Sequence, residues 1–458
     1  MKIQFLGAAG TVTGSKFYLQ TDQHKVMVDC GMFQGRKAIR ERNWEKITLD
    51  ASAIDATLLT HAHIDHTGLL PKFGAAGMEC KIHCTWGTRD LAKILLADAG
   101  RLQEEEANWR NKKKKSKHKP ALPLFTVEDA ERVTGFLKGH HYDESFEPIE
   151  GWSAIYRDAG HILGSAWLDL KPPTGERIVF SGDLGRTNAP ILKDPVKPQG
   201  ACDILFLEST YGNRSHANTD KMEDLTDIVM RVCGGGGTLV IPAFAVERTQ
   251  EVLYMLEELI RGNAIPNLPV FIDSPMAVRA TRLFREYRDY YDEETTALVR
   301  QGERVLSYKN LKLCESVQDS KSILNVKGPK IIISASGMAT GGRILHHLKN
   351  YLRDEKNHVL MVGYQSVGTR GWRLLNGEEE IKIFGDFIPV NAGVSKLEGF
   401  SGHADHNEIL EWTEGFEKPP GVTYLVHGEE DSLQAQAEVL KGKGWNVVIP
   451  EHNQVIEV

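Results

Sequence analysis

The chain has 458 residues, of which 41% are hydrophobic and 26% are charged, and its formal net charge is −7. This length accommodates two or three domains with a large core, and the composition is ordinary for a globular protein. The negative charge argues against non-specific coating of nucleic acid by the whole surface, although it permits a locally basic channel. No apolar run approaches the length that crosses a bilayer, and no signal peptide precedes the first strand.

The cysteines carry information about the compartment. Six of them are spread along the chain, and none forms a Cys-x-x-Cys pair. Together with the missing signal peptide, this pattern predicts free thiols in a reducing cytoplasm and argues against a structural zinc finger. We therefore expect a cytoplasmic protein that has no membrane partner.

The first part of the chain, up to about residue 208, alternates short apolar strands with loops and a few helices. Glycine and proline separate these segments, as they do between strands in general. The predicted strands cover residues 2–6, 17–21, 25–29, 56–59, 81–84, 154–158, 167–171, 177–181 and 203–208.

From about residue 209 the pattern becomes a regular alternation of strand and helix. Predicted strands at 238–242, 270–273, 330–334 and 358–362 alternate with predicted helices at 248–260, 277–291 and 342–352. Such alternation predicts a parallel, doubly wound sheet. After about residue 385 strands and loops return, and strands at 423–426 and 445–449 flank a helix at 432–443.

A histidine-rich loop follows the predicted strand at 56–59. Within six consecutive residues it holds His61, His63, Asp65 and His66. Imidazole and carboxylate are ligands that zinc and similar ions prefer, and α/β proteins place ligands at the carboxyl ends of their strands. His61 and His63, two residues apart, point the same way in an extended segment. The alternative is a polar surface loop, but the density of histidine favours one catalytic metal or a pair of metals.

Further polar residues end other predicted strands or lie in glycine-containing loops. Each taken alone is a satisfied polar group more often than a ligand, but glycines beside them permit the tight turns that sites need. Together with the histidine-rich loop they predict one extended site. These residues are Asp29, His161, Asp183, Glu208, His403 and His427.

The order of these motifs resembles the metallo-β-lactamase superfamily. The matching blocks are Asp29, then the run from His61 to His66, then His161, Asp183 and His427. The middle insertion, with Glu208 and His403, is similar to the β-CASP branch of nucleases, which includes the mRNA 3′-end cleavage endonuclease and bacterial ribonuclease J. Secondary matches lie at residues 7–15, 242–246 and 334–338, so the resemblance covers nearly the whole chain.

The resemblance implies two metal ions with a shared ligand. His61, His63 and His161 would hold one zinc, Asp65, His66 and His427 would hold the second, and Asp183 would bridge the two. Asp29 would orient a ligand histidine. Manganese stays open in place of zinc, because these ligand types do not choose between the two.

The resemblance also implies a reaction. A water activated at the metal pair would attack the phosphorus in line, and Asp65 would hold or accept its proton. His403 would protonate the leaving oxygen, and Glu208 would orient His403. Histidine at position 427 is similar to the RNA-processing members of the branch, since DNA-processing members usually carry an apolar residue there.

Two further groups are candidates for contact with RNA phosphates. Ser336, Gly337 and Met338 lie in a loop between a strand and a helix, where backbone N–H groups suit a phosphate, and Arg248 and Arg343 open helices. A structural turn is the alternative for the loop. The segment 110–119 contains a basic run from Lys112 to Lys115. The favoured interpretation is a solvated, mobile loop, and the alternative is a contact with the phosphate backbone of a nucleic acid.

We therefore predict an α/β protein in which a four-layer αββα metallo-β-lactamase domain carries an inserted β-CASP domain of parallel-sheet α/β type. The domains would be residues 1–208 with 385–458, and residues 209–384. The expected function is zinc-dependent hydrolysis of single-stranded RNA in RNA processing or decay. The rivals are a hydrolase of a small ester or thioester and a catalytically inactive RNA-binding subunit. Endonuclease against 5′-exonuclease action, substrate preference and oligomeric state, a homodimer included, stay open.

Overall fold

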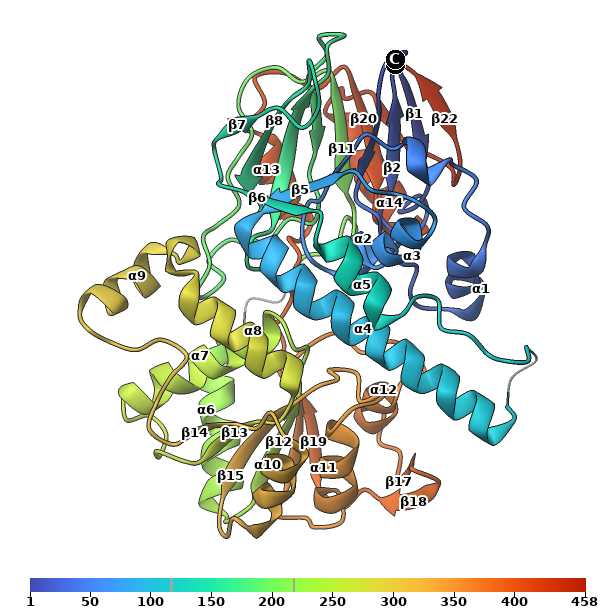
Figure 1. The fold of residues 1–458 in the computed structure, drawn as a ribbon. Helices are drawn as coiled ribbons and strands as arrows, with labels where there is room; N and C mark the ends of the chain where they lie inside the picture. Colours follow the sequence, from blue (N-terminus) through green and yellow to red (C-terminus); the bar gives the residue numbers. More distant parts are fainter. Residues whose placement is uncertain (116–117, 217–218) are drawn as a thin grey trace. The chain divides into compact units, whose positions relative to one another are not determined.

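A computed structural model describes residues 1–115, 118–216 and 219–458, and the chain divides into two compact units (Figure 1). The first unit is discontinuous and comprises Met1–Ala189, Lys193–Ser215 and His403–Val458. The second comprises Pro190–Leu192 and His216–Gly402. Among the described residues, no helix combines the length and apolar character that a bilayer crossing demands.

The first unit contains two seven-stranded sheets. The first sheet has the order β22 (Val455–Glu457), β1 (Lys2–Phe5), β2 (Phe17–Gln20), β3 (Lys25–Val28), β4 (Ala56–Leu58), β5 (Lys81–Thr85) and β6 (Leu137–His140). The second has the order β21 (Val447–Val448), β20 (Val422–Val426), β11 (Ile204–Glu208), β10 (Ile178–Phe180), β9 (Ala166–Lys171), β8 (Ser153–Asp158) and β7 (Ser145–Phe146). β3 to β6 run parallel, as do β10, β11, β20 and β21.

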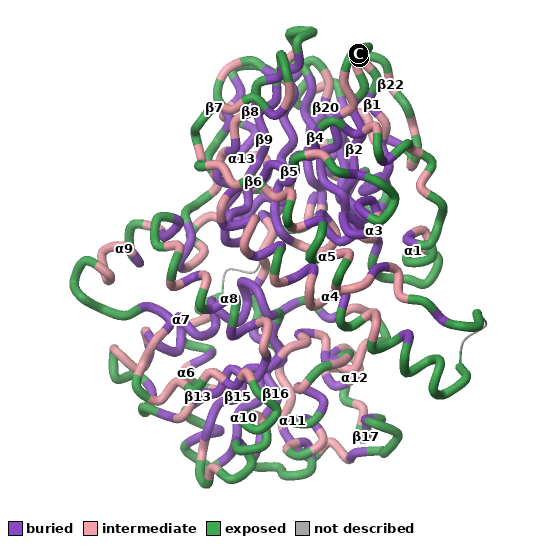
Figure 2. Tube along the Cα trace, viewed as in Figure 1, coloured by how far each residue is buried: buried purple, intermediate pink, exposed green. Residues whose placement is uncertain are grey.

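The two sheets pack face to face on an aromatic core. Phe5, Phe17, Phe180, Phe206 and Tyr424 interlock there, and the rings of Phe180 and Phe206 stack with centroids 4.2 Å apart. Such ring pairs stabilise a core by about 0.5–1.5 kcal/mol beyond the area they bury. Strands of this kind are apolar along their whole length because both faces are covered, and β11 is buried at every position (Figure 2).

Helices cover the outer faces of both sheets and complete four layers. The apolar sides of α3 (Leu70–Ala75), α4 (Trp86–Lys113) and α5 (Val127–Thr134) pack on the first sheet, and α13 (His406–Thr413) and α14 (Glu430–Gly442) pack on the second. The shorter α1 (Lys37–Glu41) and α2 (Ile64–Thr67) lie in the loops after β3 and β4. The predicted αββα sandwich is confirmed.

The second unit is built around a six-stranded sheet in which every pair of neighbours is parallel. Its order is β14 (Leu311–Leu313), β13 (Val270–Ile272), β15 (Lys330–Ser334), β12 (Thr238–Pro242), β16 (His358–Met361) and β19 (Gly393–Lys396). A hairpin of β17 (Glu380–Ile383) and β18 (Asp386–Pro389) stands apart from it. The helices are α6 (Lys221–Gly234), α7 (Arg248–Arg261), α8 (Pro275–Glu286), α9 (Glu293–Arg300), α10 (Val317–Ser322), α11 (Ile344–Tyr351) and α12 (Arg370–Leu375). The predicted parallel, doubly wound sheet is confirmed.

Several predicted limits differ from the structure. The helix predicted at 277–291 ends at Glu286, where a turn of tighter helix at Arg288–Tyr290 takes over. The two units divide after Ser215 and after Gly402, later than the limits expected after residues 208 and 384. The second limit differs because β19 pairs with β16 inside the second unit.

The first part of the basic run lies in a helix, whereas Lys115 lies beyond the end of that helix. Arg110, Lys112 and Lys113 lie in the last turn of α4, and Lys114 ends it with a φ of 52°. Cations at a helix C-terminus interact favourably with the helix dipole, which explains why the helix extends through these lysines. Residues 116 and 117 of the run lie outside the described residues.

Candidate metal centre and catalytic site

Strand ends of both sheets of the first unit bring the predicted residues together. His61 follows β4, and His63, Asp65 and His66 lie at the start of and within α2. Asp183 follows β10, His427 follows β20, and Glu208 is the last residue of β11. Because β10, β11 and β20 are parallel neighbours, their carboxyl ends meet at one edge of the sheet.

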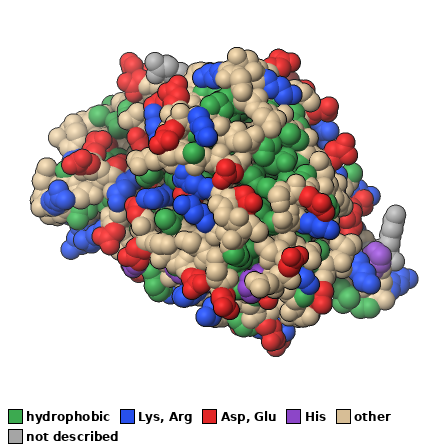
Figure 3. Space-filling model, turned by 90° about the horizontal axis from the view of Figure 1, so that it is seen from above, with side chains coloured by type: hydrophobic (Ala, Val, Ile, Leu, Met, Phe, Trp, Pro, Cys, Tyr) green, Lys and Arg blue, Asp and Glu red, His purple; other side chains and the backbone are tan. Residues whose placement is uncertain are grey.

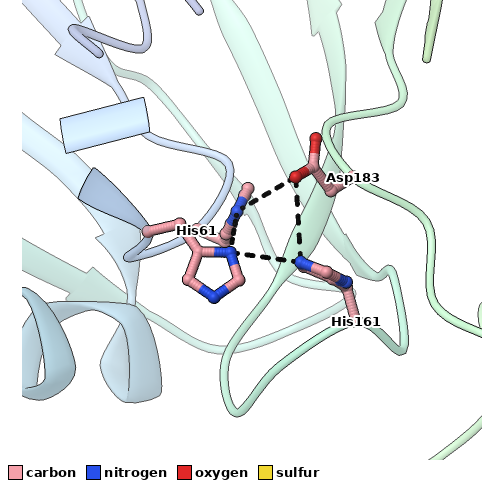
Figure 4. Close-up of side chains that lie close together, drawn as sticks. His61, His161 and Asp183 are labelled. Atoms are coloured by element: carbon pink, nitrogen blue, oxygen red, sulfur yellow. Dashed lines mark hydrogen bonds and ion pairs between the residues drawn. The ribbon is translucent and has the colours of Figure 1, made fainter. Parts of the chain in front are cut away.

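Four donors of the first predicted group converge on one point. His61 Nε2 lies 3.1 Å from His63 Nδ1, and His161 Nε2 lies 3.2 Å from the same nitrogen. Asp183 Oδ2 lies 3.5 Å from His61 Nε2 and 3.7 Å from His161 Nε2. Figure 4 shows the side chains of His61, His161 and Asp183 pointing toward one another.

The second group lies on the other side of Asp183. His66 Nε2 and His427 Nε2 are 3.2 Å apart, and Asp65 Oδ2 lies 3.6 Å from His427 Nε2. Asp183 Oδ1 lies 3.2 Å from His66 Nε2, whereas Asp183 Oδ2 faces the first group. The two oxygens of one carboxylate therefore face two separate clusters of donors.

These spacings fit a metal ion in each cluster. Ligands about 2.1 Å from a tetrahedral zinc lie about 3.4 Å from one another, and the measured separations between donors in the first group range from 3.1 to 3.7 Å. Asp183 Oδ1 is buried and accepts no hydrogen bond from the described residues. The donor set suits zinc.

Charge at the cluster is distributed unevenly. Burial lowers the pKa of His61 and of His63, so both favour the neutral form that binds metal. Burial also acts to lower the pKa of His66, but the carboxylates of Asp183 and Asp29 outweigh it and raise that pKa well above its ordinary value.

The carboxylates at the cluster stay ionised. Burial acts to raise the pKa of Asp65, but its hydrogen bond with His427 and the nearby histidines lower it to about 2. Burial likewise acts to raise the pKa of Asp183, and His427, His66 and His61 hold it well below the usual range. Both groups therefore offer negative oxygens to a cation near neutral pH.

Asp29 contacts His66, and the family resemblance implied that this carboxylate orients a ligand histidine. Its Oδ2 is 2.7 Å from His66 Nδ1, which directs His66 Nε2 toward the second group. The same carboxylate accepts hydrogen bonds from the backbone N–H and the hydroxyl of Thr60, and from the hydroxyl of Ser15. A carboxylate held this firmly fixes the orientation of the ring above it.

His403 and Glu208 lie beside the first group. Glu208 is fully buried, and its Oε2 is 3.3 Å from His403 Nδ1. The ring of His403 lies 4.5 Å from that of His161, centroid to centroid. Burial acts to lower the pKa of His403, but Glu208, supported by Asp183, raises it to about 9.

Some neighbours of the site had no assigned role in the sequence. The Thr60 hydroxyl lies 3.2 Å from His61 Nδ1, and the Thr210 hydroxyl lies 3.2 Å from His427 Nδ1. The backbone N–H of Leu184 donates to Glu208 Oε1. Thr60 stands next to His61 and Thr210 closely follows Glu208, which is the one signal that could have found them, but the partner of Thr210 is distant in sequence.

The predicted phosphate contacts lie in the second unit, where both arginines donate hydrogen bonds to neighbouring residues. Arg248 is buried and its Nη1 donates to Glu251 Oε2 at 2.7 Å. Arg343 donates to Asp273 Oδ1 and to the carbonyl oxygen of Glu315.

The loop that holds Ser336, Gly337 and Met338 precedes α11 and is also bonded internally. The Ser336 hydroxyl accepts hydrogen bonds from the backbone N–H groups of Thr340 and Gly341. Gly337 supports the ring of Phe244, and the carbonyl oxygen of Met338 accepts from Gly371 N. These contacts describe a loop stabilised by its own hydrogen bonds.

Family models match three parts of the chain. They are the metallo-beta-lactamase superfamily at residues 10–143, the Beta-Casp domain at residues 249–374, and the Zn-dependent metallo-hydrolase RNA specificity domain at residues 388–450. Together with the donor cluster, these matches indicate a metal-binding site.

Curated proteins match over the whole length. Ribonuclease TTHA0252 of Thermus thermophilus is 36% identical over 459 residues, covering 100% of both chains. An RNase J-like protein of Methanocaldococcus jannaschii is 29% identical and covers 100% of this chain and 99% of that protein. Transcription termination factor FttA of the same organism is 29% identical, and the match spans 96% of this chain and 69% of FttA.

A solved structure supports the fold. A protein of unknown function from Enterococcus faecalis V583 superposes with a TM-score of 0.56 at 13% identity, covering 99% of each chain. The resemblance stated from the motifs is confirmed by the family models and by the full-length relative. The chain belongs to the β-CASP branch of the metallo-β-lactamase superfamily.

Proposed function

We propose that this protein hydrolyses phosphodiester bonds of single-stranded RNA with two zinc ions. His61, His63 and His161 would hold one ion, Asp65, His66 and His427 would hold the other, and Asp183 would be shared between the two groups. The observation that carries the proposal is that Asp183 presents Oδ2 to one cluster and Oδ1 to the other. A pair of metal ions held there would suit phosphodiester chemistry.

RNA is proposed as the substrate because of the relatives. The full-length relative of Thermus thermophilus is named a ribonuclease, and the family model at residues 388–450 is described as an RNA specificity domain. His427 adds a reason of its own, since histidine at this position resembles the RNA-processing members of the branch, and it also completes the second donor group.

Bound zinc would polarise the phosphoryl oxygens and lower the pKa of a water toward neutrality. The side chains of the protein supply the remaining steps. Asp65 and His403 keep 18% and 20% of their side chains exposed, whereas Asp183 keeps 1%. The two groups assigned to proton transfer are therefore more accessible from solvent than the bridging carboxylate.

Asp65 acts as the acceptor, because its carboxylate stays ionised and can take a proton from the attacking water. His403 acts as the donor: Glu208 lies against its Nδ1, which leaves Nε2 to protonate the leaving oxygen. The raised pKa of His403 has the direction that a proton donor needs.

The rival functions lack a specific supporting observation. A catalytically inactive RNA-binding subunit is disfavoured by the complete donor set, since all seven predicted ligands lie in the two clusters. A hydrolase of small esters is disfavoured by the presence of the second unit, which carries the match to the Beta-Casp domain.

A cleavage assay tests the proposal. A 5′-labelled single-stranded RNA and a DNA of the same sequence are incubated with zinc-loaded wild type and with Asp65→Ala. We expect RNA-selective cleavage that the variant loses. The product ladder distinguishes internal cuts from stepwise 5′ removal. Equal turnover by the variant, or no cleavage of RNA by the wild type, would overturn the proposal. Manganese in place of zinc shows which ion supports turnover.

A further inference from the structure

Two exposed aromatic rings lie at one edge of the parallel sheet of the second unit. Phe244 follows β12 and is 44% exposed, and Tyr364 follows β16 and is 58% exposed. β12 and β16 are parallel neighbours, so both residues leave the sheet at its carboxyl edge, where α/β proteins bind ligands.

The ring of Phe244 lies near the backbone of Gly363, the residue before Tyr364, because glycine has no side chain to keep it away. A Cβ placed on Gly363, which precedes Tyr364, would lie 3.9 Å from Cε2 of Phe244. A Cβ on Gly337 would lie 3.0 Å from Cδ2 of the same ring. The ring of Phe244 therefore lies against backbone that carries no side chain, while much of its surface faces solvent.

The loop that carries Tyr364 is tied to the loop of Gly337, on which the ring of Phe244 packs. The buried side chain of Gln365 donates through Nε2 to the carbonyl oxygens of Gly337 and Gly363, at 3.0 and 3.3 Å. Arg370 donates to the carbonyl oxygens of Thr340 and Lys382. Rings held on a rigid backbone lose little conformational freedom when a partner binds.

The charge around the rings suits a polyanion. No Asp or Glu occurs in residues 335–353 or 357–377, whereas both segments contain arginine. Arg370 donates to carbonyl oxygens and, among the described residues, forms no ion pair with a carboxylate. Arg343 and Arg373 in these segments pair with Asp273 and Glu378, so Arg370, which donates to the loop of Gly337, supplies the uncompensated positive charge beside the rings.

We propose that Phe244 and Tyr364 form a platform on which unpaired bases of single-stranded RNA stack. Every base offers a flat face, so such stacking is tolerant of sequence, while nearby cations bind the backbone. This inference rests on the proposed function for its choice of RNA, and it assigns base-contacting roles to two residues outside the metal clusters.

The test compares Phe244→Leu and Tyr364→Leu with a matched control. Leucine keeps apolar packing but removes the aromatic face. Phe387→Leu is the control, because Phe387 is also 58% exposed but lies in the β17–β18 hairpin. All are made in an Asp65→Ala background, so that RNA stays intact, and Phe244→Tyr serves as the conservative variant.

Fluorescence anisotropy measures the affinity of each protein for a labelled oligouridine and for an abasic oligonucleotide of the same length. We expect each leucine variant to bind oligouridine about tenfold more weakly, with unchanged affinity for the abasic strand. Phe387→Leu and Phe244→Tyr should bind oligouridine as the parent does. A 2-aminopurine base, quenched on the parent protein, should regain fluorescence on the variants. Unchanged affinity for oligouridine, or an equal loss for the abasic strand, would overturn the platform.

Cleavage separates this inference from the proposed function. With Asp65 intact, the leucine variants should turn over bis(p-nitrophenyl) phosphate at the wild-type rate while their KM for RNA rises. If the wild type binds RNA through the rings but cleaves none, the proposed function fails and the platform stands. If the leucine variants cleave dilute RNA as fast as the wild type, the platform fails and the proposed function stands.

Discussion

At the scale of single residues, Asp29 shows how a buried carboxylate shapes the centre without belonging to either donor group. It contacts His66 Nδ1 at 2.7 Å and is held by Thr60 and Ser15. Its φ of 57° lies in the left-handed region, which Asp and Asn tolerate better than most residues.

Asp29→Asn should therefore fold, because Asn adopts the same backbone conformation, but it should hold zinc more weakly. Loss of such an outer partner typically lowers metal affinity or activity by about 10–100-fold. Zinc affinity is measured by competition with a chromophoric chelator. Asp169→Asn is the control, since Asp169 is also buried but pairs with Arg177 and touches none of the predicted ligands. Equal zinc affinity in wild type and Asp29→Asn would remove the orienting role.

His403→Ala should keep zinc and lose turnover. His403 contacts Glu208 and lies beside the first group without completing it, so its removal leaves every assigned ligand in place. General acid catalysis contributes about 10²–10⁴-fold, and the loss in kcat for RNA should fall in that range.

A substrate that needs no proton on its leaving group separates this role from a structural one. Bis(p-nitrophenyl) phosphate releases a stabilised phenolate, so His403→Ala should lose far less turnover on it than on RNA. Equal losses on both substrates would contradict the assignment of His403 as the acid. A lower zinc content in His403→Ala would indicate that His403 is a metal ligand.

At the scale of elements, most strands of the first unit were predictable, whereas β6, β7, β22 and the limits of the helices were not. β11 is an unbroken apolar run that ends in Glu208. Such a run predicts a strand that is buried on both faces, which is what the structure shows. The end of α8 at Glu286 was not predictable from periodicity, because the apolar pattern continues into Tyr290 and Tyr291. Likewise, residues 393–396 contain no pattern that predicts their place in the sheet of the second unit, because their pairing with β16 is non-local.

The start of α7 contains a strained and poorly satisfied residue. Glu247 has a φ of 68° and a ψ of −68°, and it provides no side-chain cap for the helix. Among the described residues, no group donates a hydrogen bond to its Oε2. Burial, with Glu251 nearby, raises the pKa of Glu247 to about 8.

This pKa predicts a pH dependence of stability. A carboxyl group whose pKa is raised by folding binds more protons in the folded state than in the unfolded state. Its contribution to the free energy of unfolding is therefore complete below pH 4.5 and is lost as the pH rises toward 8. Glu247→Gln mimics the protonated form and should raise the free energy of unfolding at pH 8.5 by at least about 1 kcal/mol. Urea denaturation at pH 5.5 and pH 8.5 measures the difference. A variant no more stable than wild type at the higher pH would show that Glu247 is solvated.

At the scale of the whole molecule, the metal centre joins the two sheets of the first unit. His61, His63, Asp65 and His66 come from loops of the first sheet, whereas His161, Asp183 and His427 come from loops of the second. The sequence could single out these candidate ligands because each stands in a short local motif. It could not predict which nitrogen or oxygen meets which, because those pairings depend on the packing of the two sheets.

A ligand set that spans two sheets couples metal binding to folding. Zinc that binds the native first unit but not its unfolded chain stabilises that unit by about 2.7 kcal/mol per site when free zinc is 100-fold above Kd. The second unit contains none of the assigned ligands. Chelation should therefore lower the unfolding temperature of the first unit and leave the second almost unchanged.

Hydrogen exchange followed by mass spectrometry can read the two units separately. On chelation, we expect faster exchange in α2 and in the loop around His161, and no change in β12, β13 and β15, which belong to the second unit. His63→Ala supplies the control, since zinc should protect its first unit less than that of wild type. If chelation altered exchange equally in both units, the metal would stabilise the chain as a whole and not through the junction of two sheets.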